Sequence, residues 1–203
     1  MGKTIYLMRH GQTLFNLQKR IQGWCDAPLT DLGIAQAQAA GRYFHSRQIT
    51  FDAVYSSTQE RACDTAEIVS GRMDYVRLKG LKEMNFGSFE GHSERLNPPL
   101  NLQDGSGYGD YFVAYGGESN VQVSKRMAET LTTIAEQMAE DSQVLVVTHG
   151  AALSQFYRFW TVEPPVIKGM PNCAILTIHV LADGQFRVDS VYDPVAETFL
   201  FER

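Results

Sequence analysis

Two segments of the chain share a pattern that limits the folds available to it. Residues 4–11 read Thr-Ile-Tyr-Leu-Met-Arg-His-Gly, and residues 143–150 read Gln-Val-Leu-Val-Val-Thr-His-Gly. Each is a short apolar run that stops at a histidine followed by glycine, which is typical of a buried strand in a parallel sheet. Ligands of open α/β sheets bind beyond the carboxyl ends of such strands. The pattern therefore predicts that His10 and His149 face each other at one edge of a sheet.

Predicted helices and strands alternate along the rest of the chain. Helices are expected over about 31–46, 57–70, 119–138 and 151–160, and strands over about 52–56, 75–78, 173–181 and 186–192. Ser57 with Glu60, and Ser119 with Gln122, match the capping box that starts a helix. This order predicts an α/β fold: a three-layer α/β/α sandwich with a mainly parallel sheet, which closes with an antiparallel hairpin. We expect residues 1–203 to form a single domain.

Composition and charge narrow the range of partners. The chain has 203 residues, enough for one large core, and a formal net charge of −5 at pH 7. That charge argues against nucleic acid or an anionic membrane as the main partner. The three cysteines are far apart and form no paired motif, which suits a reducing cytosol. We expect a cytoplasmic protein with no leader before the first strand and no transmembrane span, and the sequence leaves room for a homodimer.

The stretch from about 84 to 116 shows no clear periodicity. A structureless insertion of this length inside a compact domain is usually functional, so we interpret it as an irregular lid. Its formal charge is −3, because Arg95 is its only basic residue and its acidic residues are Glu90, Glu94, Asp104 and Asp110. Its aromatic residues include Tyr108, Tyr111, Phe112 and Tyr115. They pack either on a substrate or into a satellite core.

Polar groups at the predicted sheet edge favour an anionic ligand. Arg9 precedes His10, and Arg61 lies in the first turn of its predicted helix. The helix dipole disfavours a cation there, so a bound anion would explain the position of Arg61. A solvated surface arginine is the alternative interpretation. A metal site would need further ligands near the two His-Gly endings, and none follows either of them. Two guanidinium groups and two imidazoles suit a tetrahedral dianion. Phosphoryl transfer through a neutral histidine nucleophile is the chemistry that fits.

Several motifs occur in a set order over essentially the whole chain. They are Leu7-Met8-Arg9-His10-Gly11-Gln12-Thr13, Gly23-x-x-Asp26-x-Pro28-Leu29-Thr30-x-x-Gly33-x-x-Gln36-Ala37, Ser56-Ser57-x-x-x-Arg61-Ala62-x-x-Thr65-Ala66, Glu83 before Phe86-Gly87-x-x-Glu90-Gly91, Gly117-Glu118-Ser119 and Thr148-His149-Gly150. Together they closely resemble the histidine phosphatase superfamily, also called the phosphoglycerate mutase-like family.

The resemblance implies a role for each candidate residue. His10 matches the nucleophile, the residues that bind the phosphoryl group are Arg9, Arg61 and His149, and Glu83 matches the proton donor to the leaving group. The residues expected to add substrate contacts are Gln12, Thr13, Asn16, Gln22 and Gly150, with Gln12 standing where the family often has glutamate. No metal and no cofactor are implied. An acid at position 83 makes chemical sense, because an alkoxide leaving group needs a proton. We expect the neighbouring Lys82 to point away from it.

The resemblance covers more than one activity. A phosphatase acting on small-molecule phosphate monoesters is favoured, because an acidic and aromatic lid suits a monophosphate whose body carries little charge. The alternative is a cofactor-dependent phosphoglycerate mutase; such proteins are typically longer and have a more basic insertion that retains a bisphosphate. A third hypothesis is a non-catalytic protein that binds a phosphorylated ligand. Such a protein would be expected to lack the nucleophile or the acid, whereas His10 and Glu83 are both present.

Overall fold

The computed structural model of the chain describes residues 2–100, 107–167 and 169–203. Within these ranges eight strands form one sheet in the order β3-β2-β4-β1-β6-β7-β5, with β8 paired to β7. The strands are β1 (Thr4–Arg9), β2 (Ala53–Ser57), β3 (Val76–Leu78), β4 (Gln143–Thr148), β5 (Thr161–Val162), β6 (Ile175–Val180), β7 (Phe186–Asp193) and β8 (Thr198–Glu202). The neighbours β3, β2, β4 and β1 run parallel, whereas β6, β7 and β8 join in antiparallel fashion.

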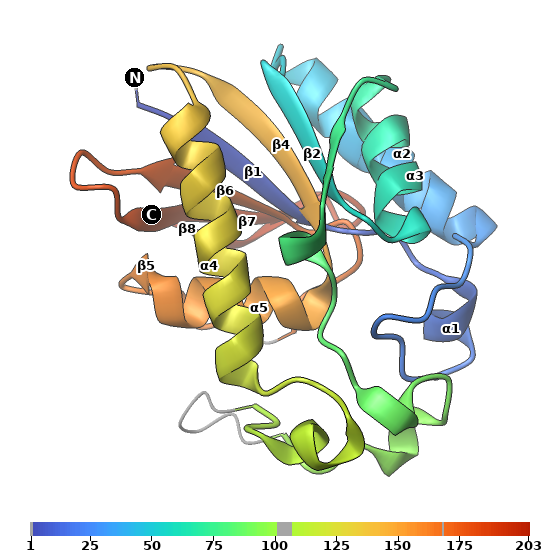
Figure 1. Cartoon of the computed structure of the whole chain (residues 1–203). Coiled ribbons are helices and arrows are strands. Elements are labelled where there is room, and N and C mark those ends of the chain that lie inside the picture. The colour runs from blue at the N-terminus through green and yellow to red at the C-terminus, as the bar shows by residue number, and fades with distance from the viewer. Residues whose placement is uncertain (1, 101–106, 168) are drawn as a thin grey trace.

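Helices cover both faces of this sheet. They are α1 (Leu14–Leu17), α2 (Asp31–Ser46), α3 (Glu60–Ser70), α4 (Asn120–Gln137) and α5 (Gly150–Trp160), with short 3₁₀ turns at η1 (Lys79–Leu81), η2 (Gly87–Phe89), η3 (Glu94–Leu96) and η4 (Tyr111–Tyr115). Figure 1 shows α2 and α3 on one face and α4 and α5 on the other. The prediction of an α/β fold with a mostly parallel central sheet is confirmed. None of the helices in the described ranges is long and apolar enough to cross a membrane.

The central strand β1 explains why the sheet needs helices on both sides. Successive side chains of a strand point to opposite faces. Ile5 and Leu7 pack into the core beneath α4 and α5, while Tyr6 and Met8 pack into the core beneath α2 and α3. All four side chains are buried. The continuous apolar run seen in the sequence therefore reflects a strand that is covered on both faces.

Two of the helix starts follow their sequence signals closely. The Thr30 side chain accepts a hydrogen bond from the Gly33 N–H at the start of α2. At the start of α4 the Ser119 and Gln122 side chains each accept a bond from the other's backbone, so the predicted capping box is confirmed. Such caps involve residues three positions apart, and a local sequence pattern is therefore enough to find them.

The start of α3 differs from the prediction. Ser57 remains in β2, and the N-cap of α3 is Gln59, whose side chain makes no capping bond. The carboxylate of Asp26 supplies the acceptor instead, because the Glu60 N–H donates to Asp26 Oδ2 at 2.6 Å. The predicted capping box at Ser57 and Glu60 is therefore wrong. A residue from a distant loop provides the acceptor that the local sequence was expected to supply.

Three short elements were not predicted. α1 has 4 residues, β5 has 2 and β8 has 5.

The described part of the lid is irregular apart from η2, η3 and η4, while residues 101–106, including Asp104, lie outside the described residues. Phe112 is fully buried, and its ring lies edge to face with Phe86, Phe89 and Tyr108 at centroid distances of 4.9, 5.5 and 5.2 Å. Phe112 is therefore a core residue, and it belongs to the same core as Ile5 and Leu7 rather than to a satellite core or a substrate-facing surface.

Candidate active site

The two His-Gly endings meet at one edge of the sheet. β1 and β4 pair in parallel with Arg9 opposite Thr148, and the His10 N–H donates to the Thr148 carbonyl at 3.0 Å. The imidazole centroids of His10 and His149 are 5.1 Å apart. The strand pattern thus located this contact correctly. Gly11 allows the chain after β1 to approach α2 closely, because a Cβ at this position would lie 2.5 Å from the Gly33 carbonyl oxygen.

The hydrogen bonds of His10 fix which ring nitrogen is free. Nδ1 lies 2.7 Å from the Gly11 carbonyl oxygen, which accepts hydrogen bonds and cannot donate them. We therefore place the proton on Nδ1 and the lone pair on Nε2. The Arg61 Nε–H donates to that Nε2 at 3.3 Å. His10 consequently presents an unprotonated nitrogen beside a guanidinium group.

Arg61 is fully buried and fixed by the loop that precedes α2. Its Nη1 donates to Asp26 Oδ1 at 2.8 Å and to the Cys25 carbonyl at 3.0 Å, and its Nη2 donates to the Gly23 carbonyl at 2.9 Å. The solvated-surface alternative is therefore wrong for this arginine. A buried guanidinium whose remaining Nε–H points at His10 is set to bind an anion at the same place.

Arg9 approaches the site from the end of β1. Its Nη1 donates to the Met170 carbonyl, and its buried Nε has no hydrogen-bond partner among the described residues. A Cβ at Gly150 would lie 3.2 Å from that Nε, so the glycine allows the guanidinium to come close to the start of α5. Arg9 and Gly150 are thus neighbours, as their expected common role in binding a phosphoryl group requires.

Burial among positive charges keeps both imidazoles neutral in the free site. Desolvation lowers the pKa of His10 well below its ordinary value of 6.5, and the charges of Arg61 and Arg9 lower it further. Desolvation also lowers the pKa of His149 well below that value, followed by the effects of Arg61 and His10. His149 is fully buried at the N-cap of α5, and neither of its ring nitrogens has a partner in the described structure. Buried polar groups without partners are uncommon, so these atoms mark a ligand position.

Three of the other predicted contact residues form one network at α1. The Thr13 hydroxyl donates to Gln22 Oε1 at 2.6 Å and accepts from the Asn16 N–H, which makes it the cap of α1. Gln22 Nε2 is buried with no partner among the described residues and so is a free donor. Asn16 Oδ1 accepts from Asn172 Nδ2 at 3.4 Å, and the same amide donates to the His10 carbonyl at 3.0 Å.

Gln12 is placed differently from its neighbours in the motif. Its Oε1 accepts from the Thr30 hydroxyl at 2.9 Å, and its N–H donates to Gln36 Oε1 at 2.9 Å. The side-chain oxygen of Gln12 is thus engaged with the first turn of α2. The structure does not bring it into contact with His10 or His149.

The Glu83 side chain lies at the N-terminus of α5, the helix that begins directly after His149. Its Oε1 accepts from the Ala152 and Met84 N–H groups, each at 2.8 Å, and its Oε2 accepts from the Ala151 N–H at 3.1 Å. A helix N-terminus favours a carboxylate through its free N–H groups and its dipole. Lys82 points away as predicted, with Nζ 3.7 Å from the centre of the Trp24 ring.

Two supporting residues were not assigned a role from the sequence. Asp26 was part of a family motif, but only the structure shows that its carboxylate accepts from both the Glu60 N–H and the Arg61 guanidinium in the first turn of α3. Asn172 lies in the loop before β6 and links His10 with Asn16, and no sequence signal singled it out. Both act through contacts with segments that are far away along the chain.

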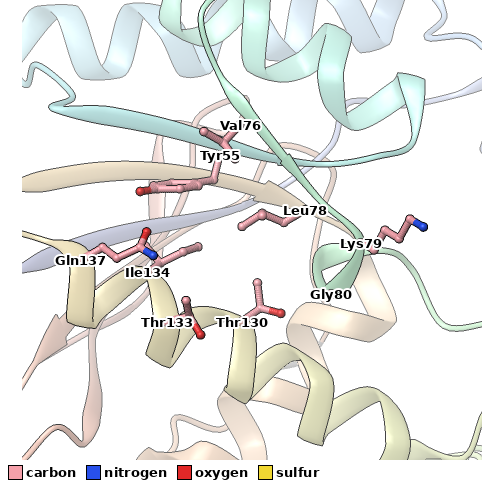
Figure 2. A pocket seen from close by; sticks show the side chains of 9 residues that line it. All are labelled: Tyr55, Val76, Leu78, Lys79, Gly80, Thr130, Thr133, Ile134 and Gln137. Carbon is pink, nitrogen blue, oxygen red and sulfur yellow. The ribbon is translucent and has the colours of Figure 1, made fainter.

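A separate groove lies elsewhere on the molecule. Figure 2 shows it between β3 and α4, lined by Tyr55, Val76, Leu78, Lys79, Gly80, Thr130, Thr133, Ile134 and Gln137. None of the predicted site residues is among them. The groove is therefore distinct from the cluster around His10.

Comparisons with known proteins show the family to which the chain belongs. The family model of the histidine phosphatase superfamily (branch 1) matches residues 5–194. A probable phosphoglycerate mutase, GpmB, from Proteus mirabilis is 36% identical over 158 residues, 73% of this chain and 70% of that protein. A metal-independent phosphoserine phosphatase from Arabidopsis thaliana is 31% identical over 196 residues, 93% of this chain and 81% of that protein. The crystal structure of a phosphoglycerate mutase from Bacillus anthracis has a TM-score of 0.80 at 27% identity, covering 95% of this chain and 93% of that one. The sequence motifs, the fold and these matches together show that the chain belongs to the histidine phosphatase superfamily.

Proposed function

We propose that the protein is a phosphatase that hydrolyses small-molecule phosphate monoesters through a phosphohistidine on His10. The observation that carries the proposal is the unprotonated Nε2 of His10, which accepts a hydrogen bond from Arg61 Nε at a buried place where the donors of Arg9 Nε and of the His149 ring have no partner among the described residues. A phosphoryl group would satisfy those donors and place its phosphorus in front of the nucleophile.

The proposed reaction has two steps. In the first, His10 Nε2 attacks phosphorus, the bond between phosphorus and the ester oxygen breaks, and the leaving alkoxide takes a proton from Glu83. In the second step, the oxygen of a water molecule attacks phosphorus while Glu83 accepts a proton from that water. The phosphorus–nitrogen bond then breaks to release inorganic phosphate. The groups that bind the phosphoryl oxygens are Arg9, Arg61, His149, Asn16 and Gln22.

The surroundings of the other nearby carboxylates support Glu83 as the acid. Both oxygens of Glu118 accept hydrogen bonds from Arg126, and one also accepts from the Asn85 N–H. Glu90 accepts from the backbone N–H groups of Trp24, Cys25 and Phe86. Glu83 also accepts backbone N–H bonds, but those of Ala151 and Ala152 hold it at the N-terminus of α5, the helix whose N-cap is His149, whereas the bonds of Glu90 and Glu118 hold loops together.

A phosphoglycerate mutase is the second candidate, because relatives with that name match most of the chain. A mutase must retain a second phosphate near the site. The lid carries one arginine against four acidic residues, so a bisphosphate would meet like charges there. This balance favours hydrolysis of a monophosphate.

The test is to compare hydrolysis with transfer in the same preparation. The protein is incubated with p-nitrophenyl phosphate, with phosphoserine, and with 3-phosphoglycerate plus 2,3-bisphosphoglycerate, with the His10→Ala variant as the blank. We expect phosphate release from the monoesters without any bisphosphate. Formation of 2-phosphoglycerate faster than phosphate release would establish the mutase instead, and no turnover in any assay would leave a binding protein.

A further inference from the structure

The side-chain amide of Gln59 joins the two halves of the candidate site. It is 4% exposed, at the point where β2 gives way to α3. Its Oε1 accepts from the Glu83 N–H at 2.9 Å, and its Nε2 donates to the Gly23 carbonyl at 2.6 Å. Because a carbonyl oxygen can only accept, these two partners fix which end of the amide faces which residue.

The Gly23 carbonyl is shared with the phosphoryl-binding side of the site. It accepts from Arg61 Nη2 at 2.9 Å as well as from Gln59. Arg61 in turn lies 3.3 Å from the nucleophilic nitrogen of His10. A continuous chain of hydrogen bonds therefore runs from the acid, through one amide and one carbonyl, to the arginine beside the nucleophile.

The remaining bonds of Glu83 lead to other parts of the fold. Its carbonyl accepts from Arg126 Nη2 at 2.9 Å and from Trp24 Nε1 at 3.0 Å, and its carboxylate is held by α5. Among the described residues, Gln59 is the side chain that connects Glu83 with the start of α3, the helix that carries Arg61.

We infer that Gln59 is a positioning residue that holds the acid Glu83 at a fixed separation from Arg61; this inference rests on the proposed function. General acid catalysis needs the acid within hydrogen-bond reach of the leaving oxygen, and a displacement of about 1 Å can cost roughly 10²-fold. Loss of the amide leaves the buried Glu83 N–H without its acceptor, so the backbone that carries the acid shifts. The amide makes no capping bond to α3, so its loss removes no helix cap.

The experiment measures kcat/KM for an alkyl and an aryl phosphate with Gln59→Met, which keeps the length of the side chain and removes both hydrogen bonds. With phosphoserine we expect a fall of about tenfold, a part of the roughly 10²–10⁴-fold that general acid catalysis contributes as a whole. With p-nitrophenyl phosphate, whose leaving group needs little protonation, we expect a fall below about twofold. The Kd of vanadate should stay within about twofold, because the phosphoryl-binding groups remain.

A double-mutant cycle separates positioning from a general loss of structure. If Gln59 acts through Glu83, adding Gln59→Met to Glu83→Gln should cause no further loss with phosphoserine. Gln143→Met is the matched control. Gln143 is the first residue of β4, at the end of the strand opposite the site, and its side chain accepts from the Tyr6 hydroxyl. Its replacement should leave the activity with both substrates unchanged. Gln59→Asn, whose amide is too short to reach both partners, provides a second variant should Gln59→Met not fold, and it should show the same selective loss.

Equal losses for both substrates, no loss for either, or additive losses in the double variant would each overturn the inference. These outcomes differ from failure of the proposed function. If Glu83→Gln itself causes no selective loss with phosphoserine, the acid assignment fails and the inference fails with it. If Glu83→Gln shows that loss and the Gln59 variants do not, the inference alone is wrong.

Discussion

The imidazole rings of His10 and His149 lie edge to face, with centroids 5.1 Å apart and ring planes inclined by 60°. They follow β1 and β4, two strands that pair in parallel and therefore end at the same edge of the sheet. Both rings are buried next to arginine side chains, which keeps their pKa values low. The pair is thus uncharged in the free site, where the unprotonated Nε2 of His10 accepts a hydrogen bond from Arg61 Nε.

Replacement of His10 with alanine should abolish turnover and the covalent intermediate. Rapid quenching of the wild-type protein under non-acidic conditions, with a labelled monoester, should trap a phosphoprotein that is acid-labile and base-stable. The reason is that the proposed nucleophile is His10 Nε2, the ring nitrogen left unprotonated when Nδ1 donates to the Gly11 carbonyl. Label that persists in His10→Ala would move the covalent step to another residue.

Glu83→Gln should discriminate between leaving groups. General acid catalysis contributes about 10²–10⁴-fold, and we expect the phosphorylation step to fall by about that factor for an alkyl phosphate. The same step with p-nitrophenyl phosphate should fall much less, because its leaving group is a stable anion. Single-turnover kinetics isolate this step from dephosphorylation. Equal losses for both substrates would show that Glu83 is not the acid.

Stability should decrease as the pH falls below about 6.5. The pKa values of His10 and His149 are lowered well below their ordinary value of 6.5 in the folded protein, so below that pH the unfolded chain binds more protons than the folded one. The free energy of unfolding contributed by these neutral, buried rings is present above the unfolded pKa and is lost below it. Urea unfolding between about pH 5 and pH 8 measures the slope.

The matched comparison for this slope uses two histidine variants. His149→Asn should flatten the dependence on pH, because it removes one of the two protons that differ between the states. His45→Asn changes an exposed histidine in the last turn of α2 and should leave the slope as it is. A wild-type protein whose stability is constant or rises toward acidic pH would contradict the prediction.

The aromatic residues of the lid should divide into two functions. Phe112 is fully buried among other rings, so Phe112→Ala should lower the free energy of unfolding by about 3–5 kcal/mol and leave relative specificities alone. Tyr108 is partly exposed, and its pKa is raised first by burial and then by the Glu94 and Glu83 carboxylates. Tyr108→Phe should therefore change kcat/KM ratios among monophosphates at nearly wild-type stability. The opposite pattern would assign the core role to Tyr108.

Activity should not require a divalent metal ion. The positive charge at the site comes from Arg9, Arg61 and the imidazole of His149 once an anion binds, and in the proposed mechanism no step needs a Lewis acid. Prolonged treatment with EDTA should leave the rate unchanged, and vanadate should inhibit competitively with the substrate. A loss of activity that Mg²⁺ or Zn²⁺ restores would show that this assignment of charge is wrong.

The sequence by itself determined the elements whose signals are local. The apolar runs before His10 and His149 specified buried parallel strands, and the Ser119 capping box specified the start of α4. The order of the motifs also identified the family. These features could be predicted because an apolar run and a capping box are each formed by residues within a few positions of one another along the chain.

The tertiary structure decided the features that depend on contacts between distant segments. Asp26 rather than Ser57 caps α3, and Asn172 joins the loop after β1 from the far end of the chain. Glu83 could be assigned by resemblance, but only the structure shows that its carboxylate binds the N-terminus of α5 and that Gln59 links it to Arg61. Each depends on a hydrogen bond between groups that are brought together by packing of the sheet and helices, and no periodic pattern along the chain records such a bond.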